Sequence, residues 1–517
     1  IIMSVNPASV TNPPAQFPED FVFGGATAAY QVEGETRTHG KGKVAWDDFL
    51  EAQGRFSPDP ASDFYNQYPV DLELCEEFGI NGIRLSIAWS RIFPNGIGEI
   101  NPEGVQFYHD LFAECHKHHV EPFVTLHHFD TPLPLFEKGD FLNRETIDAF
   151  VDFATFCFKE YADQVTYWFT FNEIWADASN TYIEGTFPGG VKAHLAEAFQ
   201  CEHNMMLAHA KAVLAFHNGG FKGKIGVIQS LEFKYPLNEN DPADIKAANN
   251  EHVLQNQFLL DATFRGDYAP DTLECANRLA AVSGGTIQIL DEDLEIMREA
   301  ALYNDYLGVN NYQCRFLKAY DGENDLHHNG TGEKGTGRWR VKGIGEHVNK
   351  PGIPTTDWDW IIYPEGLYDL LLRIKNDYPN YKKIYITDFY EPCAESLVMD
   401  INENFAPVAE LVHHGDYAKI AECNVVMNAS GIGMGSTIGQ TPMPVEHIQP
   451  GQFYFDACYN PDKTQFLLNA EEKGCQVLNG LGMSLYQGAA QIELWTGEKA
   501  PVEAMRKELM DILAESK

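Results

Sequence analysis

The feature that most limits how this chain can fold is an alternation, along residues 17–388, of short β-rich runs with longer amphipathic stretches. Such alternation is typical of βα units, in which each helix crosses over to the next strand of a parallel sheet. The β-rich runs are residues 21–30, 82–90, 121–127, 165–172, 224–230, 306–311 and 383–387. The helical stretches between them include residues 69–78, 104–118, 144–161 and 195–216. The pattern predicts an α/β fold built on a (β/α)₈ TIM-type barrel.

Composition excludes several classes of partner. The net charge of −38 opposes binding to nucleic acid, and no apolar run reaches the roughly 20 residues that span a bilayer. Residues 1–16 lack a signal-peptide pattern and are predicted to form a disordered or extended tail. Ten cysteines without a CxxC pair favour free thiols in a reducing compartment, so we expect a cytoplasmic protein. Its expected partner is a small molecule.

Polar side chains follow several of the predicted strands. Asn172 and Glu173 come directly after the fourth strand, and in a barrel the chemistry lies where strands end at their carboxyl side. Cleaving a glycosidic bond with retention needs one carboxylic acid to protonate the leaving oxygen and a second carboxylate to attack the anomeric carbon. A surface glutamate at a strand end is the commoner reading of Glu173 taken alone. Nearby aromatic and histidine residues favour a sugar site: His127, His128, Trp168, Trp175, Trp358 and Trp360.

The two adjacent histidines suggest zinc as an alternative. Metal sites use spacings such as HExxH, and that spacing is missing here, so we predict no metal. Residues 321–337, which are rich in Gly, Asn and charge, are predicted to form an insertion loop.

Residues 17–387 resemble glycoside hydrolase family 1, and in particular those members that act on 6-phosphorylated β-galactosides. The matching segments are FVFGGATAAYQVEG at 21–34, GINGIRLSIAWSRIFPNG at 79–96, VTLHHFDTPLPL at 124–135, WFTFNEI at 168–174 and TDWDWIIYPEGLYDLL at 356–371. The resemblance implies a cytoplasmic retaining β-glycosidase that takes a sugar or sugar-phosphate substrate and needs no cofactor.

The resemblance also implies residue roles. Glu173 would be the general acid/base, and Arg84 would lie beside the nucleophile. The other residues implied in binding the substrate or in contacting the nucleophile are Gln31, His128, Asn172, Asn310, Tyr312 and Trp360.

The family pattern stops at the nucleophile. Where the family has Ile-Thr-Glu-Asn-Gly, this chain has Ile386, Thr387, Asp388, Phe389 and Tyr390. Asp388 is one methylene shorter than glutamate, and a misplacement of about 1 Å can cost on the order of a hundredfold in rate. The family's eighth strand and the downstream residues that hold the 6-phosphate are also missing, so the barrel is predicted to be incomplete at strand eight.

Residues 392–499 instead resemble the carboxyl-terminal part of the shikimate/quinate dehydrogenase family. The segments are NVVMNASGIGMG at 424–435, FDACYNPDKT at 455–464 and NGLGMSLYQGAAQIELWTG at 479–497. This implies an α/β segment over 389–517 like half of a Rossmann-like domain. Its glycines 431, 433 and 435 lead into a loop pattern and do not open a helix, so no dinucleotide cofactor is predicted.

Two strand-like runs lie in this part of the chain, at 396–401 and 424–428. One hypothesis is that residues 424–429 take the eighth place in the barrel by pairing with 383–387 and 21–26, because an open sheet edge is usually avoided.

Three functions remain open from the sequence. The first is a hydrolase of phosphorylated β-galactosides with Glu173 as acid and Asp388 as a poor nucleophile. The second is a sugar-binding chimera without turnover, and the third is an NAD(P)-dependent shikimate/quinate dehydrogenase-like protein.

Overall fold

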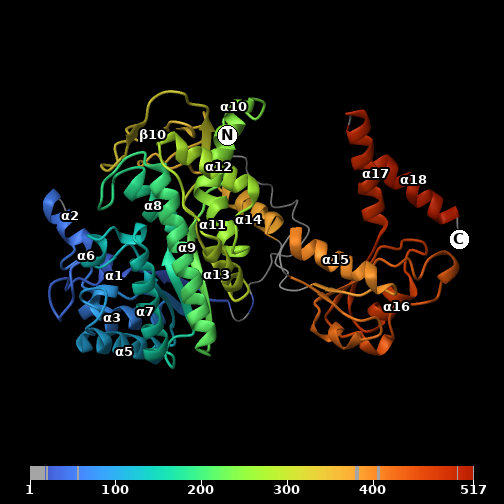
Figure 1. Cartoon of the computed structure of the whole chain (residues 1–517), viewed down its shortest axis with the longest axis horizontal. Helices are drawn as coiled ribbons and strands as arrows, with labels where there is room; N and C mark the ends of the chain where they lie inside the picture. The colour runs from blue at the N-terminus through green and yellow to red at the C-terminus, as the bar shows by residue number, and fades with distance from the viewer. Residues whose placement is uncertain are drawn as a thin grey trace. The chain divides into compact units, whose positions relative to one another are not determined.

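The structure, a computed structural model, describes residue 18 and residues 21–54, 57–378, 384–404, 408–497 and 499–515. The chain divides into two compact units, Ile1–Pro379 and Asn380–Lys517 (Figure 1). The tail predicted at residues 1–16 lies outside the described residues. None of the helices in the described ranges is both long and apolar enough to cross a membrane.

The first unit is built on a six-stranded parallel half-barrel sheet in the order β1-β2-β3-β4-β5-β7. Its strands are β1 (Gly24–Ala26), β2 (Gly82–Ser86), β3 (Glu121–His127), β4 (Tyr167–Asn172), β5 (Lys224–Ser230) and β7 (Tyr306–Asn310). All neighbouring pairs are parallel. Six of the predicted strands are therefore confirmed. The residues of β3 and β4 are mostly buried, as expected where helices cover a parallel sheet.

Amphipathic helices supply the crossovers. The predicted helices appear as α3 (Phe64–Glu77), α5 (Pro102–Lys117), α7 (Arg144–Glu160) and α9 (Leu195–Asn218). The long α9, green in Figure 1, packs against α7 and three further helices, α8 (Ile174–Tyr182), α12 (Pro270–Val282) and α13 (Asp291–Ala301). The remaining helical segments of this unit are α1 (Ala29–Val32), α2 (Ala45–Gln53), α4 (Trp89–Ile92), α6 (Leu133–Phe136), η2 (Asp140–Leu142), α10 (Pro242–His252), the π-helical η3 (Val253–Gln257), α11 (Phe258–Phe264) and α14 (Glu365–Asp377).

A second sheet in this unit was not predicted. It has five strands in the order β6-β8-β11-β10-β9. They are β6 (Lys234–Pro236), β8 (Arg315–Lys318), β9 (Asp325–His327), β10 (Arg338–Val341) and β11 (Gly345–Val348). The predicted insertion loop at 321–337 thus contains a strand, β9, which pairs with β10. The short lengths of these strands explain why their alternation does not stand out in the sequence.

The seventh predicted strand forms but does not extend the half-barrel sheet. Within 383–387, β12 (Ile384–Ile386) pairs in parallel with β13 (Ala409–Leu411), and residue 383 lies outside the described residues. The helix between them, α15 (Glu391–Asn404), supplies the crossover that a parallel pair requires. The strand predicted at 396–401 is wrong, since these residues belong to α15.

The hypothesis that residues 424–429 complete the barrel is also wrong. The strand in this segment, β14 (Val425–Asn428), pairs with β15 (Phe453–Asp456), which pairs in turn with β16 (Gln476–Asn479). The second unit therefore has its own three-stranded parallel sheet. Its other elements are η4 (Tyr417–Glu422), η5 (Gly435–Thr437), η6 (Val445–His447), α16 (Gln465–Glu472), α17 (Leu481–Thr496) and α18 (Val502–Glu515).

Candidate active site

Glu173 lies where β4 ends and α8 begins. Its backbone has a φ of +51°, a left-handed conformation that non-glycine residues rarely adopt. The Glu173 amide donates to the carbonyl oxygen of Ile228 on β5 at 2.7 Å, and the register of β4 against β5 shifts between Phe169 and Asn172. Irregularities of this kind re-aim side chains at sheet edges. The Glu173 side chain ends up 8% exposed at the carboxyl edge of the sheet.

Two residues at the end of β7 contact this carboxyl group. The Asn310 amide donates to Glu173 Oε1, and the same Nδ2 donates to Asn172 Oδ1 at 3.2 Å. The Tyr312 hydroxyl donates to Glu173 Oε1 at 3.4 Å. The structure therefore brings together four of the residues that the sequence singles out, from the ends of β4 and β7.

Burial raises the pKa of Glu173 above its ordinary value, which favours the protonated acid. The Asn310 amide and the Arg84 guanidinium act in the opposite direction. Arg84 is itself half-buried, and burial lowers its pKa. Its Nε has no hydrogen-bond partner among the described residues. A guanidinium near a buried carboxyl can receive an anionic or hydroxyl ligand.

His128 is a neutral ring in a buried position. Burial, with the nearby Arg84 charge, lowers the His128 pKa to about 3. Its Nδ1 is buried and makes no hydrogen bond within the described part of the chain. The neighbouring His127 instead contacts the Thr131 hydroxyl through Nε2 at 2.9 Å. Among the described residues no group of three or more His, Cys, Asp or Glu side chains is arranged to hold a metal ion.

A cavity of about 800 Å³ opens beside Glu173. Tyr312 and Trp360 also line it, with their rings 5.6 Å apart. Trp360 is 43% exposed, so its face is available for stacking on a sugar. This volume lies in the ordinary range for small-molecule sites and is large enough for a disaccharide.

Two of the other predicted site residues, Gln31 and Asp388, are exposed to solvent. Gln31 lies on α1 and is exposed. Asp388 belongs to the second unit, where it is exposed and its Oδ1 accepts from the Tyr390 amide at 2.9 Å. This local turn occupies one oxygen of the Asp388 carboxylate.

Sequence reasoning missed a second set of charged side chains on the same cavity. Glu232, Glu251, Arg315 and His347 all line it. Glu232 stands two residues after β5, whereas the polar residues singled out from the sequence follow other strands. Its place at the carboxyl edge of the sheet is the signal that could have found it.

A buried carboxyl beside a sugar-sized cavity, at the carboxyl edge of a parallel sheet, is typical of a glycoside hydrolase. The chain belongs to glycosyl hydrolase family 1, whose model matches residues 14–397. It is 56% identical over 371 residues to the 6-phospho-beta-galactosidases of Staphylococcus aureus strains Newman and MRSA252, covering 72% of this chain and 79% of those proteins. Residues 480–510 match a second model, the Shikimate 5'-dehydrogenase C-terminal domain.

Solved structures agree with the family. The family 1 β-glucosidase from Thermotoga maritima is 30% identical with a TM-score of 0.61, covering 72% of this chain and 78% of that one. The same enzyme in complex with deoxynojirimycin is 31% identical with a TM-score of 0.60 and the same coverage. The similarity therefore covers most, but not all, of a family 1 enzyme.

Proposed function

We propose that this chain is a retaining β-glycosidase of the 6-phospho-β-galactosidase type, in which Glu173 donates the catalytic proton. The observation that carries the proposal is the position of Glu173, which is buried, has a raised pKa and lines the cavity of about 800 Å³. The name of the S. aureus relatives, at 56% identity, supports phosphorylated β-galactosides as the substrate class.

The proposed chemistry begins with protonated Glu173. As the bond between the anomeric carbon and the glycosidic oxygen breaks, the oxygen keeps the electron pair and takes the proton from Glu173. The carboxylate left behind is stabilised by the donors already in contact with it, Asn310 and Tyr312. Arg84 and the neutral ring of His128 are proposed to hold the sugar on the cleaved side.

In the same step a second carboxylate must form a bond to the anomeric carbon. In the second half of the cycle water displaces that carboxylate from the anomeric carbon and gives its proton to Glu173. Asp388 is the proposed nucleophile by its position in the family pattern. Its carboxylate is one methylene short, is exposed and is engaged by the Tyr390 amide. These features favour a second candidate function, in which the chain binds phosphorylated β-galactosides but turns them over slowly or not at all.

Release of nitrophenol from nitrophenyl β-galactoside 6-phosphate, and from the unphosphorylated glycoside, tests the proposal. We expect slow release by the unaltered chain, loss of release in Glu173→Gln and faster release in Asp388→Glu. No product with either substrate in any variant, together with a ligand-dependent rise in melting temperature, selects the binding function. No product and no stabilisation by either glycoside overturns both.

A further inference from the structure

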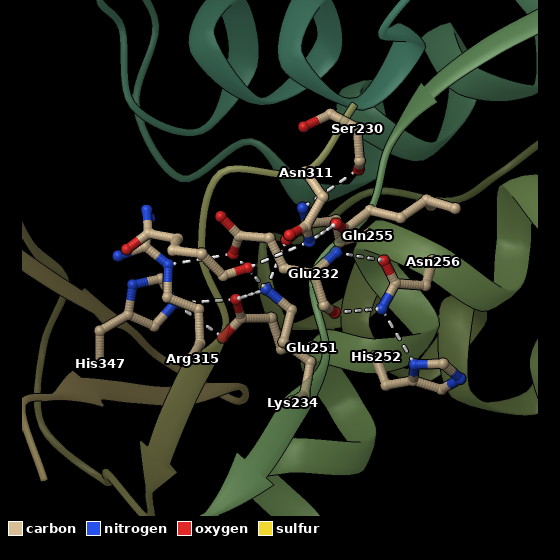
Figure 2. Close-up of polar contacts among 12 residues, drawn as sticks. Ser230, Glu232, Lys234, Glu251, His252, Gln255, Asn256, Asn311, Arg315 and His347 are labelled. Carbon is tan, nitrogen blue, oxygen red and sulfur yellow. Dashed lines mark hydrogen bonds and ion pairs between the residues drawn. The ribbon is translucent and has the colours of Figure 1, made fainter. Parts of the chain in front are cut away.

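The cavity beside Glu173 continues to a second polar end, which we name the Lys234 cluster. Its members are Glu232, Lys234, Glu251, Gln255, Arg315 and His347. They come from segments far apart in the sequence: the β5–β6 connection, β6, α10, η3, β8 and β11. Figure 2 shows Lys234 between the two glutamates, with Arg315 and His347 approaching from the five-stranded sheet.

Lys234 is the fixed centre of this cluster. Its side chain is 0% exposed, and its Nζ donates to Glu232 Oε2 at 3.0 Å and to Glu251 Oε1 at 2.7 Å. The third donor goes to Gln255 Oε1. An ammonium group has three donors, so Lys234 has none left for a ligand. Its role is to hold Glu232 and Glu251 in place.

Glu232 and Arg315 keep binding capacity that faces the cavity. Each uses a single side-chain atom in its contacts, since Arg315 Nε donates to the same Glu232 Oε2 at 3.0 Å. Among the described residues, Glu232 Oε1 and the two terminal nitrogens of Arg315 make no hydrogen bond. Glu232 is 8% exposed, and both residues line the cavity. Glu232 Oε1 and these nitrogens are therefore available to bind a ligand group in the cavity.

The charge state of Glu232 fits this role. Burial alone would raise its pKa, but Arg315 and Lys234 outweigh burial and hold the pKa below its ordinary value. Glu232 is therefore an anionic acceptor at neutral pH, next to a guanidinium donor. A sugar hydroxyl both donates and accepts, so such a pair is suited to two neighbouring hydroxyls of one ring.

The position of the cluster identifies which sugar it would bind. Residues proposed to contact the cleaved sugar, such as His128 and Arg84, do not line this cavity, whereas Glu173 does. A proton donor lies between the cleaved sugar and the leaving group, so the cavity beyond Glu173 is on the leaving-group side. Trp358 and Trp360 line it as well and offer apolar faces.

We infer that Glu232 and Arg315 bind the leaving sugar of a β-linked disaccharide and set a preference for sugar over non-sugar leaving groups. This inference rests on the proposed function. The pair determines specificity and takes no part in the proton transfer. The remaining members of the Lys234 cluster are positioning residues.

Calorimetric binding, which needs no turnover, tests the inference. The two probes are galactose 6-phosphate and the sulfur-linked galactosyl-glucose disaccharide carrying the same 6-phosphate, which resists hydrolysis. We expect Arg315→Met to weaken binding of the disaccharide by about tenfold or more, because a charge-assisted hydrogen bond is lost. The affinity for galactose 6-phosphate stays unchanged. Glu232→Gln should also weaken binding of the disaccharide, and Arg315→Lys should weaken it less than Arg315→Met does.

The matched control is Arg298→Met, which removes an arginine of the same unit that pairs with Asp267 at 2.6 Å and does not line the cavity. It should leave both affinities unchanged. If Arg315→Met proves unstable, since it leaves buried Glu232 short of a partner, Arg315→Lys and Glu232→Gln decide the outcome.

The possible failures are distinct. The inference is overturned if the unaltered protein binds both probes and the variants change the two affinities equally or change neither. The proposed function would still stand in that case. Failure of the unaltered protein to bind either probe overturns the proposed function and the inference together.

Discussion

Glu173 and Glu232 are two buried carboxyl groups on one cavity whose surroundings shift their pKa values in opposite directions. Burial dominates at Glu173 and raises its pKa. At Glu232 the cations Arg315 and Lys234 overcome burial and lower it. The difference follows mainly from charge, since the groups that donate hydrogen bonds to Glu173 are neutral, whereas those that donate to Glu232 are cations. One carboxyl is thus suited to donating a proton and the other to accepting hydrogen bonds.

The raised pKa of Glu173 makes a prediction about stability. The unfolded chain loses this proton near pH 4.5, whereas the folded protein holds it to higher pH. The free energy of unfolding therefore falls as the pH rises from the unfolded pKa through the folded one. Glu173→Gln lacks this titration, so we expect the stability of the unaltered protein relative to the variant to decrease over that interval. Urea unfolding of both proteins between about pH 4 and pH 7 measures the difference. A difference that stays constant or grows with pH contradicts the prediction.

The neighbourhood of Glu173 could be predicted from the sequence because the carboxyl ends of neighbouring parallel strands meet at one edge of the sheet. By that rule Asn172, Asn310 and Tyr312 are expected near Glu173, and the hydrogen bonds among the four side chains agree. Apart from Glu232, the Lys234 cluster could not be predicted in the same way. It joins α10 to the strands of a small second sheet, whose pairing no local pattern specifies.

At the scale of the element, the parallel sheet depends on close approach between strands. Gly226 on β5 lies opposite Tyr306 on β7. The Tyr306 hydroxyl donates to the carbonyl of Trp168 at 2.7 Å, so its ring lies across Gly226. A Cβ atom at Gly226 would lie 2.2 Å from the Tyr306 carbonyl oxygen, which belongs to the backbone and cannot rotate away.

We expect Gly226→Ala to lower the free energy of unfolding of the first unit by about 1–3 kcal/mol, since the two strands must separate to accept the methyl group. The matched control is Gly25→Ala on β1, where an added Cβ meets nothing within 4 Å. That change should stay within about 0.5 kcal/mol. Equal effects of the two substitutions, measured by urea unfolding, would count against this account of the sheet.

The errors in predicting elements share one cause, which is that short apolar runs are ambiguous. Residues 396–401 have the composition of a strand but lie in α15. The prediction fails here because six residues are too few to distinguish the strand period of 2 from the helix period of 3.6. The strand β12 forms at its predicted place, yet its predicted partner is wrong. A local stretch of sequence can show that a strand forms. Which strand pairs with it depends on the helix that connects the two, here α15 between β12 and β13.

At the scale of the whole molecule, each unit has a hydrophobic core of its own. Phe150 lies in the large cluster of the first unit and is 0% exposed. Phe466 lies in a small cluster of the second unit and is 1% exposed. Separate cores support separate cooperative transitions.

Calorimetric unfolding should therefore resolve two transitions. Phe466→Ala should shift only one of the two transitions to lower temperature, and Phe150→Ala only the other. Each substitution should lower the free energy of unfolding of its own unit by about 3–5 kcal/mol, because a buried aromatic ring is lost. A single transition that both substitutions lower equally would show that the units unfold as one.

The backbone of Glu173 has a consequence for how this protein could change over time. A φ of +51° is comfortable for glycine but costs any residue with a Cβ on the order of 1–2 kcal/mol. Glycine at this position would relieve the backbone strain of the first unit and would at the same time remove the acid. If selection for hydrolysis were lost, this backbone strain would therefore favour replacement of Glu173 by glycine.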